Sequence, residues 1–416
     1  MDKFIINSTK SLNGEVNISG AKNAVLPLMT ACIINPGEYT LNNVPILRDT
    51  LTMAKLLEMV GAKVVIDQNK FIINTKNCNT PYAPYDLVKT MRASFYVLGP
   101  FMSRFDKAQV SLPGGCAWGP RPVDFHIKAL EKMGAKIELS GGYINASGKL
   151  KGADIIFDKS SVGATGNIMM AAVKAKGITK IQNSAKEPEI DCLMDFLNLM
   201  GADIHRAKNG AIIIKGVETL KDNINFDVIP DRIEAGTFMI AVAMCKGKVK
   251  LTNVNPNHLS VVTNKLLDSG ASINIKNNSL TIEMQNRPKS VDISTETYPG
   301  FPTDLQAQWM ALMTIAKGSC SVTETIYTDR FTHIAELQRL GAKIYLDNNV
   351  AHINGVNKLY GAQVMSTDIR ASASLVIAGL ASEVETEISR IYHIDRGYEK
   401  IEKKFALIGG QIKRVN

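Results

Sequence analysis

The sequence predicts an α/β protein of two domains, because one α/β unit recurs six times and the 416 residues exceed what a single hydrophobic core usually serves. In each repeat a predicted helix ends in Gly-Ala or Gly-Gly just before a short strand. A glycine after a helix is the usual left-handed cap, so each one predicts a helix end. The six glycines lie roughly 70 residues apart, and they are Gly61, Gly134, Gly201, Gly270, Gly341 and Gly409.

An alanine-rich helix is predicted near the start of each repeat. Residues 235–241 are small and mostly apolar, which predicts helices that are buried on nearly all sides. A strand such as 249–252 follows the helix, and a hairpin such as 63–66 with 71–74 closes the unit. The six predicted helix starts lie near Ala21, Thr90, Ser161, Asp231, Thr303 and Asp368.

The sixth repeat ends before its closing strand. Residues 4–7 read Phe-Ile-Ile-Asn, as residues 71–74 do, so we expect this N-terminal segment to pair with a strand near 411–415. The six units then divide as three plus three, with one domain at 20–229 and the other formed by 1–19 and 230–416. Two chain crossings between domains favour a hinge and a cleft.

Composition excludes several classes of protein. Hydrophobic residues make up 45% and charged residues 21%, and no apolar run is long enough for a membrane helix. The six cysteines have no CxxC spacing, which argues against zinc and against a disulfide scaffold and favours the cytoplasm. The net charge of +9 indicates either a solvated basic surface or an anionic ligand. Nucleic acid is disfavoured, because the chain has no dense Lys/Arg run and no base-stacking platform.

Charged and polar residues gather at the starts of the alanine-rich helices, where unpaired N–H groups favour anions. Routine capping is the alternative interpretation: Thr303 stands three residues before Gln306, the spacing of a capping box, and Asp304 would then only complement the helix dipole. Taken together, the six starts favour an anion site. The residues are Lys22, Asn23, Arg92, Lys159, Asp231, Arg232, Asp304, Asp368 and Arg370.

A glycine-rich loop within the segment 110–126 carries Cys116. Arg121 and the helix that follows favour a thiolate or a readily donated proton at this sulfur. A lone cysteine is more often structural, but this loop reverses that expectation. The other five cysteines have no such surroundings and are expected to be inert: Cys32, Cys78, Cys192, Cys245 and Cys320.

An ordered set of motifs along almost the whole chain resembles the UDP-N-acetylglucosamine enolpyruvyl transferases. Each motif alone is weak, whereas the set is specific. The resemblance implies the inside-out pair of α/β barrels of the enolpyruvyl transferase fold, which agrees with the six repeats. The motifs are GAKNA at 20–24, MRAS at 91–94, PGGC at 113–116, RPVD at 121–124, VGAT at 162–165, PDRIE at 230–234, FPTD at 301–304, DIRASA at 368–373 and HIDRGY at 393–398.

The resemblance also implies substrates and residue roles. Phosphoenolpyruvate would be held by Lys22, Arg121 and Arg396, with Asn23 beside Lys22. Asp304 would be the base at the 3′-hydroxyl of UDP-N-acetylglucosamine, and Cys116 would protonate the methylene carbon of the donor. The further substrate-binding positions that the resemblance implies are Arg92, Pro122, Val123, Asp124, His126, Lys159, Ser161, Val162, Gly163, Ile326, Arg330, Asp368 and Arg370.

This chemistry agrees with the residue types. A donor with two anionic ends needs several cations, and addition of a hydroxyl needs a base at oxygen and an acid at carbon. Arginines and helix ends can stabilise the charges, so no metal and no cofactor are expected. The reaction would be the first committed step of peptidoglycan synthesis. The oligomeric state stays open.

Two other functions remain as alternatives. A 5-enolpyruvylshikimate-3-phosphate synthase shares the fold and the donor but lacks the Pro-Gly-Gly-Cys loop. A non-catalytic ligand-binding relative would not need Lys22, Cys116, Asp304 and Arg396 together.

Overall fold

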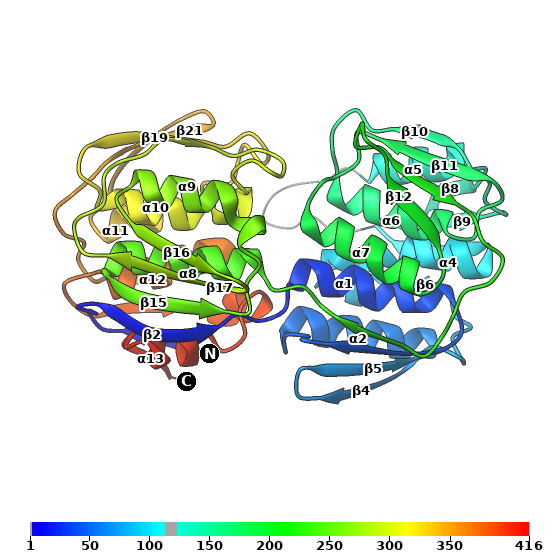
Figure 1. Cartoon of the computed structure of the whole chain (residues 1–416), viewed down its shortest axis with the longest axis horizontal. Helices are drawn as coiled ribbons and strands as arrows, with labels where there is room; N and C mark the ends of the chain where they lie inside the picture. The colour runs from blue at the N-terminus through cyan, green and yellow to red at the C-terminus, as the bar shows by residue number, and fades with distance from the viewer. Residues whose placement is uncertain (1, 113–122, 416) are drawn as a thin grey trace. The chain divides into compact units, whose positions relative to one another are not determined.

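The computed structural model describes residues 2–112 and 123–415, and its internal contacts divide the chain into two compact units. The central unit is Gly20–Ile229, and the terminal unit consists of Met1–Ser19 with Pro230–Asn416. Figure 1 shows both units with their helices and strands labelled.

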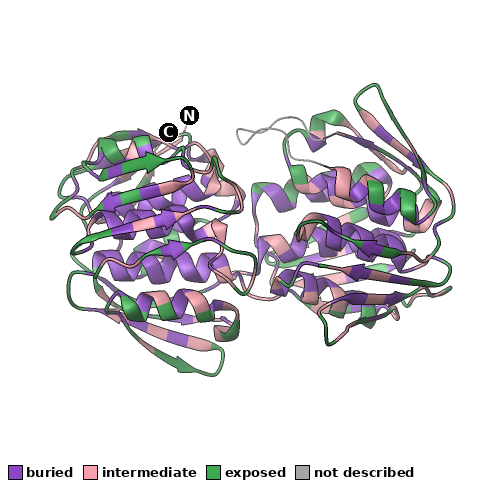
Figure 2. Ribbon diagram, turned by 90° about the horizontal axis from the view of Figure 1, so that it is seen from above, coloured by how far each residue is buried: buried purple, intermediate pink, exposed green. Residues whose placement is uncertain are grey.

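The described part of the central unit has three largely buried helices, with further helices and three sheets around them (Figures 1 and 2). The buried helices are α1 (Lys22–Ala31), α4 (Leu98–Phe105) and α6 (Val162–Ala172); the others are α2 (Arg48–Val60), α3 (Tyr85–Val88), α5 (Asp124–Lys132) and α7 (Pro188–Leu199), with the 3-10 turns η1 (Cys32–Ile34) and η2 (Arg92–Val97). The strands are β3 (Glu38–Asn42), β4 (Lys63–Asp67), β5 (Lys70–Asn74), β6 (Tyr82–Ala83), β7 (Lys107–Ser111), β8 (Lys136–Ser140), β9 (Tyr143–Ser147), β10 (Asp154–Ile156), β11 (Ile178–Gln182), β12 (Asp203–Arg206), β13 (Ile212–Lys215) and β14 (Ile224–Asp227). They form sheets in the orders β14-β3-β5-β4, β6-β7-β9-β8 and β10-β11-β13-β12.

The terminal unit repeats this plan within its described residues. Its buried helices are α8 (Arg232–Cys245), α10 (Gln306–Thr314) and α12 (Ile369–Leu380); the others are α9 (Ser260–Asp268), α11 (Ile334–Arg339) and α13 (Ile401–Leu407), with the 3-10 turns η3 (Pro256–Leu259), η4 (Thr303–Leu305) and η5 (Ile391–Arg396). The strands are β1 (Lys3–Ile6), β2 (Leu12–Asn17), β15 (Gly247–Thr252), β16 (Ser272–Lys276), β17 (Ser279–Met284), β18 (Ile293–Ser294), β19 (Ser319–Thr323), β20 (Lys343–Asp347), β21 (Val350–Asn354), β22 (Gln363–Met365), β23 (Thr386–Ser389) and β24 (Ile412–Val415). Their sheets have the orders β16-β17-β15-β2, β18-β19-β21-β20 and β22-β23-β1-β24.

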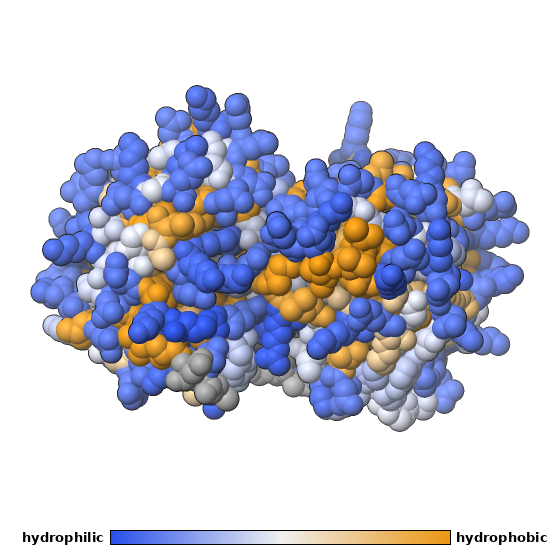
Figure 3. All heavy atoms as spheres, turned by 90° about the horizontal axis from the view of Figure 1, so that it is seen from below, coloured by the Kyte–Doolittle hydropathy of each residue, from blue (hydrophilic) through white to orange (hydrophobic). Residues whose placement is uncertain are grey.

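Helices therefore lie inside each unit and sheets lie outside, which confirms the expected inside-out arrangement (Figure 2). The reason is the lack of a polar face on the inner helices: α8 is buried from Ile233 to Cys245. Each unit has its own hydrophobic core. On the face shown in Figure 3, hydrophilic residues cover much of the surface and hydrophobic residues show between them.

The N-terminal strand closes the sixth sheet. Strand β1 pairs antiparallel with β24, with Phe4 opposite Arg414, so the predicted pairing is confirmed. Figure 1 accordingly marks the two chain ends close together. Phe4 is fully buried, and this burial fixes the register because a slip by one residue would turn Phe4 to solvent.

The six predicted glycine caps are confirmed. All six glycines have positive φ, between 92° and 105°. Each cap repeats one pair of hydrogen bonds: the N–H of Gly270 donates to the carbonyl of Leu267, and the N–H of Ala271 to that of Leu266. This pairing is the Schellman motif, which satisfies the last carbonyls of the helix.

We expect Gly270→Ala to lower the free energy of unfolding by about 1–2 kcal/mol, because an L-residue strains the left-handed backbone. Nothing lies within 4 Å of the added Cβ, so the cost is conformational alone. Urea denaturation measures it. The matched control is Gly163→Ala, inside a helix with ordinary φ, which should keep or raise stability by up to about 1 kcal/mol. Equal effects of the two substitutions would contradict the argument.

Four of the predicted helix starts agree with α1, α6, α8 and α12 to within a residue. Near Thr90 and Thr303 the chain instead forms the 3-10 turns η2 and η4, and the α-helices begin at Leu98 and Gln306. Such turns are common at helix N-termini because they tighten the first turn.

Candidate functional site

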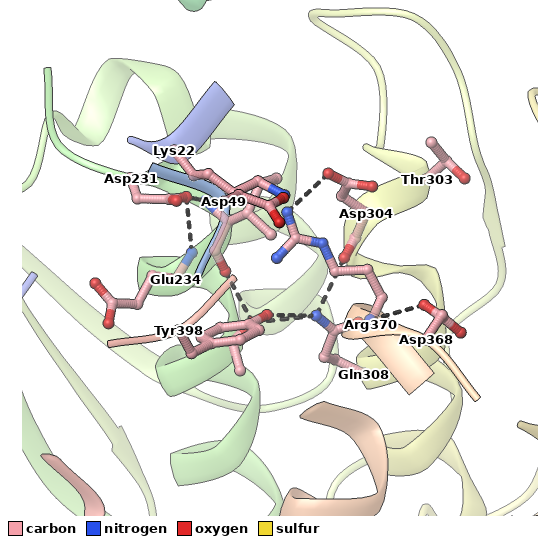
Figure 4. A network of polar contacts seen from close by, with 12 residues as sticks. Lys22, Asp49, Asp231, Glu234, Thr303, Asp304, Gln308, Asp368, Arg370 and Tyr398 are labelled. Atoms are coloured by element: carbon pink, nitrogen blue, oxygen red, sulfur yellow. Dashed lines mark hydrogen bonds and ion pairs between the residues drawn. The ribbon is translucent and has the colours of Figure 1, made fainter. Parts of the chain in front are cut away.

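Asp304 of the terminal unit lies between two arginines (Figure 4 shows one of them). Its Oδ2 lies 2.9 Å from Nη2 of Arg370, the second residue of α12, and its Oδ1 lies 2.9 Å from Nη1 of Arg330, in the loop before α11. The side chains of Arg370 and Arg330 are 5% and 11% exposed. Two largely buried guanidinium groups thus share one carboxylate.

Arg370 stays charged in this setting. Burial lowers its pKa, but the nearby Asp304, Tyr398 and Asp231 outweigh burial and raise the pKa above its ordinary value. Its Nη1 is buried and has no hydrogen-bond partner among the described residues. The guanidinium also lies over the Tyr398 ring, with its Cζ 5.5 Å from the ring centroid. Asp368 caps the same helix and accepts from the backbone N–H of Arg370 at 2.8 Å.

The capping box of the alternative interpretation is not formed at Thr303. The Thr303 hydroxyl donates to Glu324 at 2.8 Å and accepts from Arg330 at 3.0 Å, and the side chain of Gln306 has no hydrogen bond within the described chain. The buried carboxylate of Glu324 is a stronger acceptor than any helix group. The same carboxylate accepts from the backbone N–H of Ile326 at 2.8 Å, which fixes the turn that carries this predicted binding residue.

A buried network of polar side chains holds the backbone of Asp304 in place (Figure 4). Gln308 donates from Nε2 to the backbone carbonyl of Asp304 and to the Thr237 hydroxyl, both at 3.1 Å, and lies 3.2 Å from the Tyr398 hydroxyl. The Tyr398 and Thr237 oxygens are 2.8 Å apart. These hydrogen bonds connect helices α8 and α10 to the backbone of Asp304. Arg396, two residues before Tyr398, is half-buried at the end of η5.

Lys22 and Asn23 occupy the first turn of α1 in the central unit. Lys22 is 8% exposed, and its Nζ lies 3.5 Å from Oδ2 of Asp49, in the first turn of α2. Asn23 is half-buried beside it. A buried ammonium group needs a charge partner, and Asp49 supplies one.

A second group in the central unit surrounds His126 on α5. Gly163, in the first turn of α6, faces the ring: a Cβ there would lie 3.5 Å from Nε2. Ser161 caps α6 by accepting from the N–H of Ala164 at 3.2 Å. Burial and the charge of Arg92 lower the pKa of His126 to about 3, so the ring is neutral.

The other predicted binding residues of this region lie around that group. Val162 is half-buried and begins α6, and Lys159 is exposed just before it. Val123 caps α5 and Asp124 begins it, with Asp124 Oδ2 3.6 Å from Lys128 Nζ. The predicted site residues Cys116, Arg121 and Pro122 lie outside the described residues.

The other five cysteines are all buried. Burial raises the pKa of each thiol, to about 12 for Cys192, Cys245 and Cys320 and above the ordinary value for Cys32 and Cys78. Each is therefore a protonated thiol at neutral pH, and a protonated thiol is a poor nucleophile.

Because His126 and His333 are buried, we expect the protein to lose stability in acid. His333 resembles His126: burial and the charge of Arg330 lower its pKa to about 3. A histidine in the unfolded chain has a pKa of about 6.5. Between that pH and about pH 3 the unfolded chain binds more protons than the folded one, so the free energy of unfolding decreases as the pH is lowered. The decrease is at most about 1.4 kcal/mol per pH unit for each ring. Urea unfolding near pH ~5 and ~7 measures the loss.

The comparison that isolates this effect is His333→Gln, which should lose less stability between the two pH values than the wild type. Substitution of the exposed His352 should leave the difference unchanged. An unaltered pH dependence in His333→Gln would contradict a neutral buried ring.

Several residues of these groups were not predicted from the sequence: Asp49, Thr237, Gln308, Glu324 and Tyr398. Thr237 and Gln308 did carry a signal, because they are polar residues inside otherwise apolar helices. Asp49 and Glu324 carried none, since their side-chain partners are distant in sequence.

Within residues 2–112 and 123–415, no three His, Cys, Asp or Glu side chains are grouped as a metal site would require. None of the described helices is both long and apolar enough to cross a membrane.

Comparison with known proteins gives a family and a fold. A family profile described as EPSP synthase (3-phosphoshikimate 1-carboxyvinyltransferase) matches residues 6–405. A UDP-N-acetylglucosamine 1-carboxyvinyltransferase of Trichlorobacter lovleyi is 51% identical, and one of Shewanella piezotolerans is 50% identical, in both cases over 100% of both chains.

Solved structures share the fold. The enolpyruvyl transferase NikO of Streptomyces tendae matches with a TM-score of 0.91 at 22% identity, covering 100% of this chain and 99% of that one. An EPSP synthase of Acinetobacter baumannii matches with a TM-score of 0.79 at 19% identity over 100% of both chains. These likenesses show the enolpyruvyl transferase fold.

Proposed function

Because the chain belongs to the UDP-N-acetylglucosamine 1-carboxyvinyltransferase family, we propose that it transfers the enolpyruvyl group of phosphoenolpyruvate to the 3′-hydroxyl of UDP-N-acetylglucosamine. The observation that carries the proposal is the pairing of Asp304 with Arg330 and Arg370 in a chain that shares half its residues with relatives of that name.

Asp304 would be the base in the addition step. It takes the proton of the sugar 3′-hydroxyl, and the oxygen then bonds to the central carbon of phosphoenolpyruvate. Both carboxylate oxygens contact an arginine, so one of these contacts must yield to the hydroxyl when the acceptor binds. Gln308 holds the backbone of Asp304 during this exchange.

Cys116 would supply the matching acid. It gives a proton to the methylene carbon as the new C–O bond forms, and the product is a tetrahedral adduct that still carries phosphate. Elimination follows: the Cys116 thiolate takes a proton back from the methyl group, the bond from carbon to the phosphate oxygen breaks so that phosphate leaves, and the double bond is restored. The thiol is suited to this role because it is a stronger acid than a hydroxyl group.

The cations would bind the donor. Phosphoenolpyruvate has a phosphate and a carboxylate, and we assign them to Lys22, Arg121 and Arg396. The nearly buried Arg370, which pairs with Asp304, adds a further positive charge. Donors that are fixed before the reaction stabilise developing charge without reorganisation.

We assign the acceptor to the group around His126 in the central unit and to Ile326 and Asp368 of the terminal unit. The proposed positions are Asn23, Arg92, Pro122, Val123, Asp124, Lys159, Ser161, Val162, Gly163, Ile326 and Asp368. Helix starts such as that of α6 present N–H groups that suit the diphosphate of a nucleotide sugar.

The second candidate is transfer to shikimate 3-phosphate, which the description of the family profile favours. Sequence identity favours the first candidate. The chain is 51% and 50% identical to two UDP-N-acetylglucosamine 1-carboxyvinyltransferases, but only 19% identical to the EPSP synthases of known structure.

The products test the proposal. Incubation with phosphoenolpyruvate and UDP-N-acetylglucosamine should yield an enolpyruvyl ether at the sugar 3′-oxygen, identified by mass spectrometry and by the vinyl protons in NMR. An ether at another oxygen, or none, would contradict it. The product would enter peptidoglycan synthesis, and we propose that the reaction takes place in the cytoplasm. We assign no metal, cofactor, nucleic acid or membrane to it.

A further inference from the structure

Asn167 on α6 contacts the ring of His126 and is itself held at two further points. Its Oδ1 accepts from the backbone N–H of Gly99 at 2.6 Å, and its Nδ2 donates to the backbone carbonyl of Phe95 at 2.9 Å. The same Nδ2 lies 3.2 Å from Nδ1 of His126. Asn167 is 2% exposed, so water does not compete for these contacts.

These contacts fix the proton on the ring. A backbone N–H only donates and a backbone carbonyl only accepts, so the amide of Asn167 has one possible orientation. Its Nδ2 therefore donates to His126, whose Nδ1 must present a lone pair. In the neutral ring the proton is then on Nε2.

A charged ring is disfavoured for the same reason, because it would set an Nδ1–H against the N–H of Asn167. Arg92, on η2, is the charged group in the described chain whose field acts on the ring. The facing positions of α6, Gly163 and Asn167, are uncharged, and Phe95 packs edge-on with ring centroids 4.9 Å apart. Burial adds to the preference for the neutral form.

The Nε2–H faces the first turn of α6. A Cβ at Gly163 would lie 3.5 Å from Nε2 and 3.6 Å from Cε1, so glycine at this position leaves this edge of the ring uncovered by α6. No described residue accepts a hydrogen bond from Nε2. Gly163 and Asn167 are four residues apart on one face of α6. The helix therefore contacts Nδ1 of the ring through Asn167 and places a residue without a side chain opposite Nε2.

We propose that Asn167 is a positioning residue: it fixes His126 as the neutral Nε2–H tautomer, which donates to an acceptor oxygen of the bound nucleotide sugar at the start of α6. The identity of the ligand rests on the proposed function. A neutral ring fixed in one tautomer donates equally across the physiological pH range, so wild-type binding does not depend on titration of His126.

Nitrogen NMR of the full-length protein labelled with ¹⁵N-histidine tests the tautomer directly. His126, identified by loss of its signal in His126→Gln, should show a protonated Nε2 and an unprotonated Nδ1 from about pH 5 to 8. His333 is the internal reference, because it is buried but faces Met310 Sδ and should not respond to UDP-N-acetylglucosamine. A proton on Nδ1, or titration near the ordinary pKa, would overturn the proposal.

Asn167→Asp tests the positioning role. A carboxylate accepts from Nδ1–H, so it should raise the pKa of His126 and, above that pKa, leave Nε2 without a proton. Calorimetric affinity for UDP-N-acetylglucosamine should then fall about tenfold as the pH rises through the raised pKa, whereas wild-type affinity stays level over that range. Affinity in Asn167→Asp that matches wild type at every pH would overturn the role.

Gly163→Ala covers the case in which Asn167→Asp does not fold. Its Cβ makes ordinary contact with the ring and should keep the tautomer but cover this edge of the ring, so affinity should again fall about tenfold. Unchanged affinity would place the ligand elsewhere and overturn the proposal. If the wild-type protein binds no UDP-N-acetylglucosamine, both the proposed function and this ligand are overturned. Whether Asn167 sets the tautomer of His126 is decided by the NMR spectrum alone.

Discussion

Asp304→Asn should reduce turnover by roughly 10²–10⁴-fold, because a positioned base contributes about that much and an amide cannot accept the hydroxyl proton. Asparagine keeps the shape of the side chain and can still accept from Arg370. It removes the negative charge that balances two largely buried guanidinium groups, so a lower melting temperature is also expected. Steady-state kinetics and thermal unfolding of the same preparation separate the two effects.

The matched control is Asp191→Asn, which removes the carboxylate that pairs with Arg206 at 2.6 Å on the central unit. This substitution breaks an arginine ion pair outside the proposed site and should leave turnover unchanged. Normal turnover in a destabilised Asp304→Asn protein would show that Asp304 is only a structural partner of the arginines.

Cys116→Ser should lose most turnover, and a small anionic epoxide such as fosfomycin should alkylate only Cys116 in the wild type. The expectation rests on the glycine-rich loop and on Arg121, and on the inertness of the other thiols. All five of those are buried with raised pKa values, so they offer neither access nor thiolate. Peptide mass mapping after brief exposure locates the adduct.

Cys116→Asp separates acid catalysis from nucleophilicity at this position. An aspartate can still donate a proton but offers no sulfur, so this variant should retain some turnover and resist the epoxide. Adducts spread over several cysteines, or wild-type turnover in Cys116→Ser, would remove Cys116 from the mechanism.

Much of the fold could be predicted because it depends on local signals. The six caps follow from glycine at the αL position, and Phe4 to Asn7 could be placed by their likeness to residues 71–74. The 3-10 turn before α10 could not be predicted, because the hydroxyl of Thr303 donates to Glu324, which is near only in the folded chain.

Residues of the candidate site could be predicted where they belong to family motifs. Residues whose role depends on tertiary contacts were harder to predict. Asp304 was named from its motif, but its two arginine partners are 26 and 66 residues away in sequence, and nothing local shows that all three meet. Gln308 and Asn167 are polar residues in apolar helices, which marks them as unusual, yet their partners depend on how the helices pack.

Phosphate release from phosphoenolpyruvate with different acceptors tests the central claim most directly. Wild-type protein should release phosphate rapidly with UDP-N-acetylglucosamine, and only at the background rate with shikimate 3-phosphate or with no acceptor. Release with shikimate 3-phosphate would assign the chain to the other acceptor, and no release with either would contradict the account of an enolpyruvyl transferase acting on a nucleotide sugar.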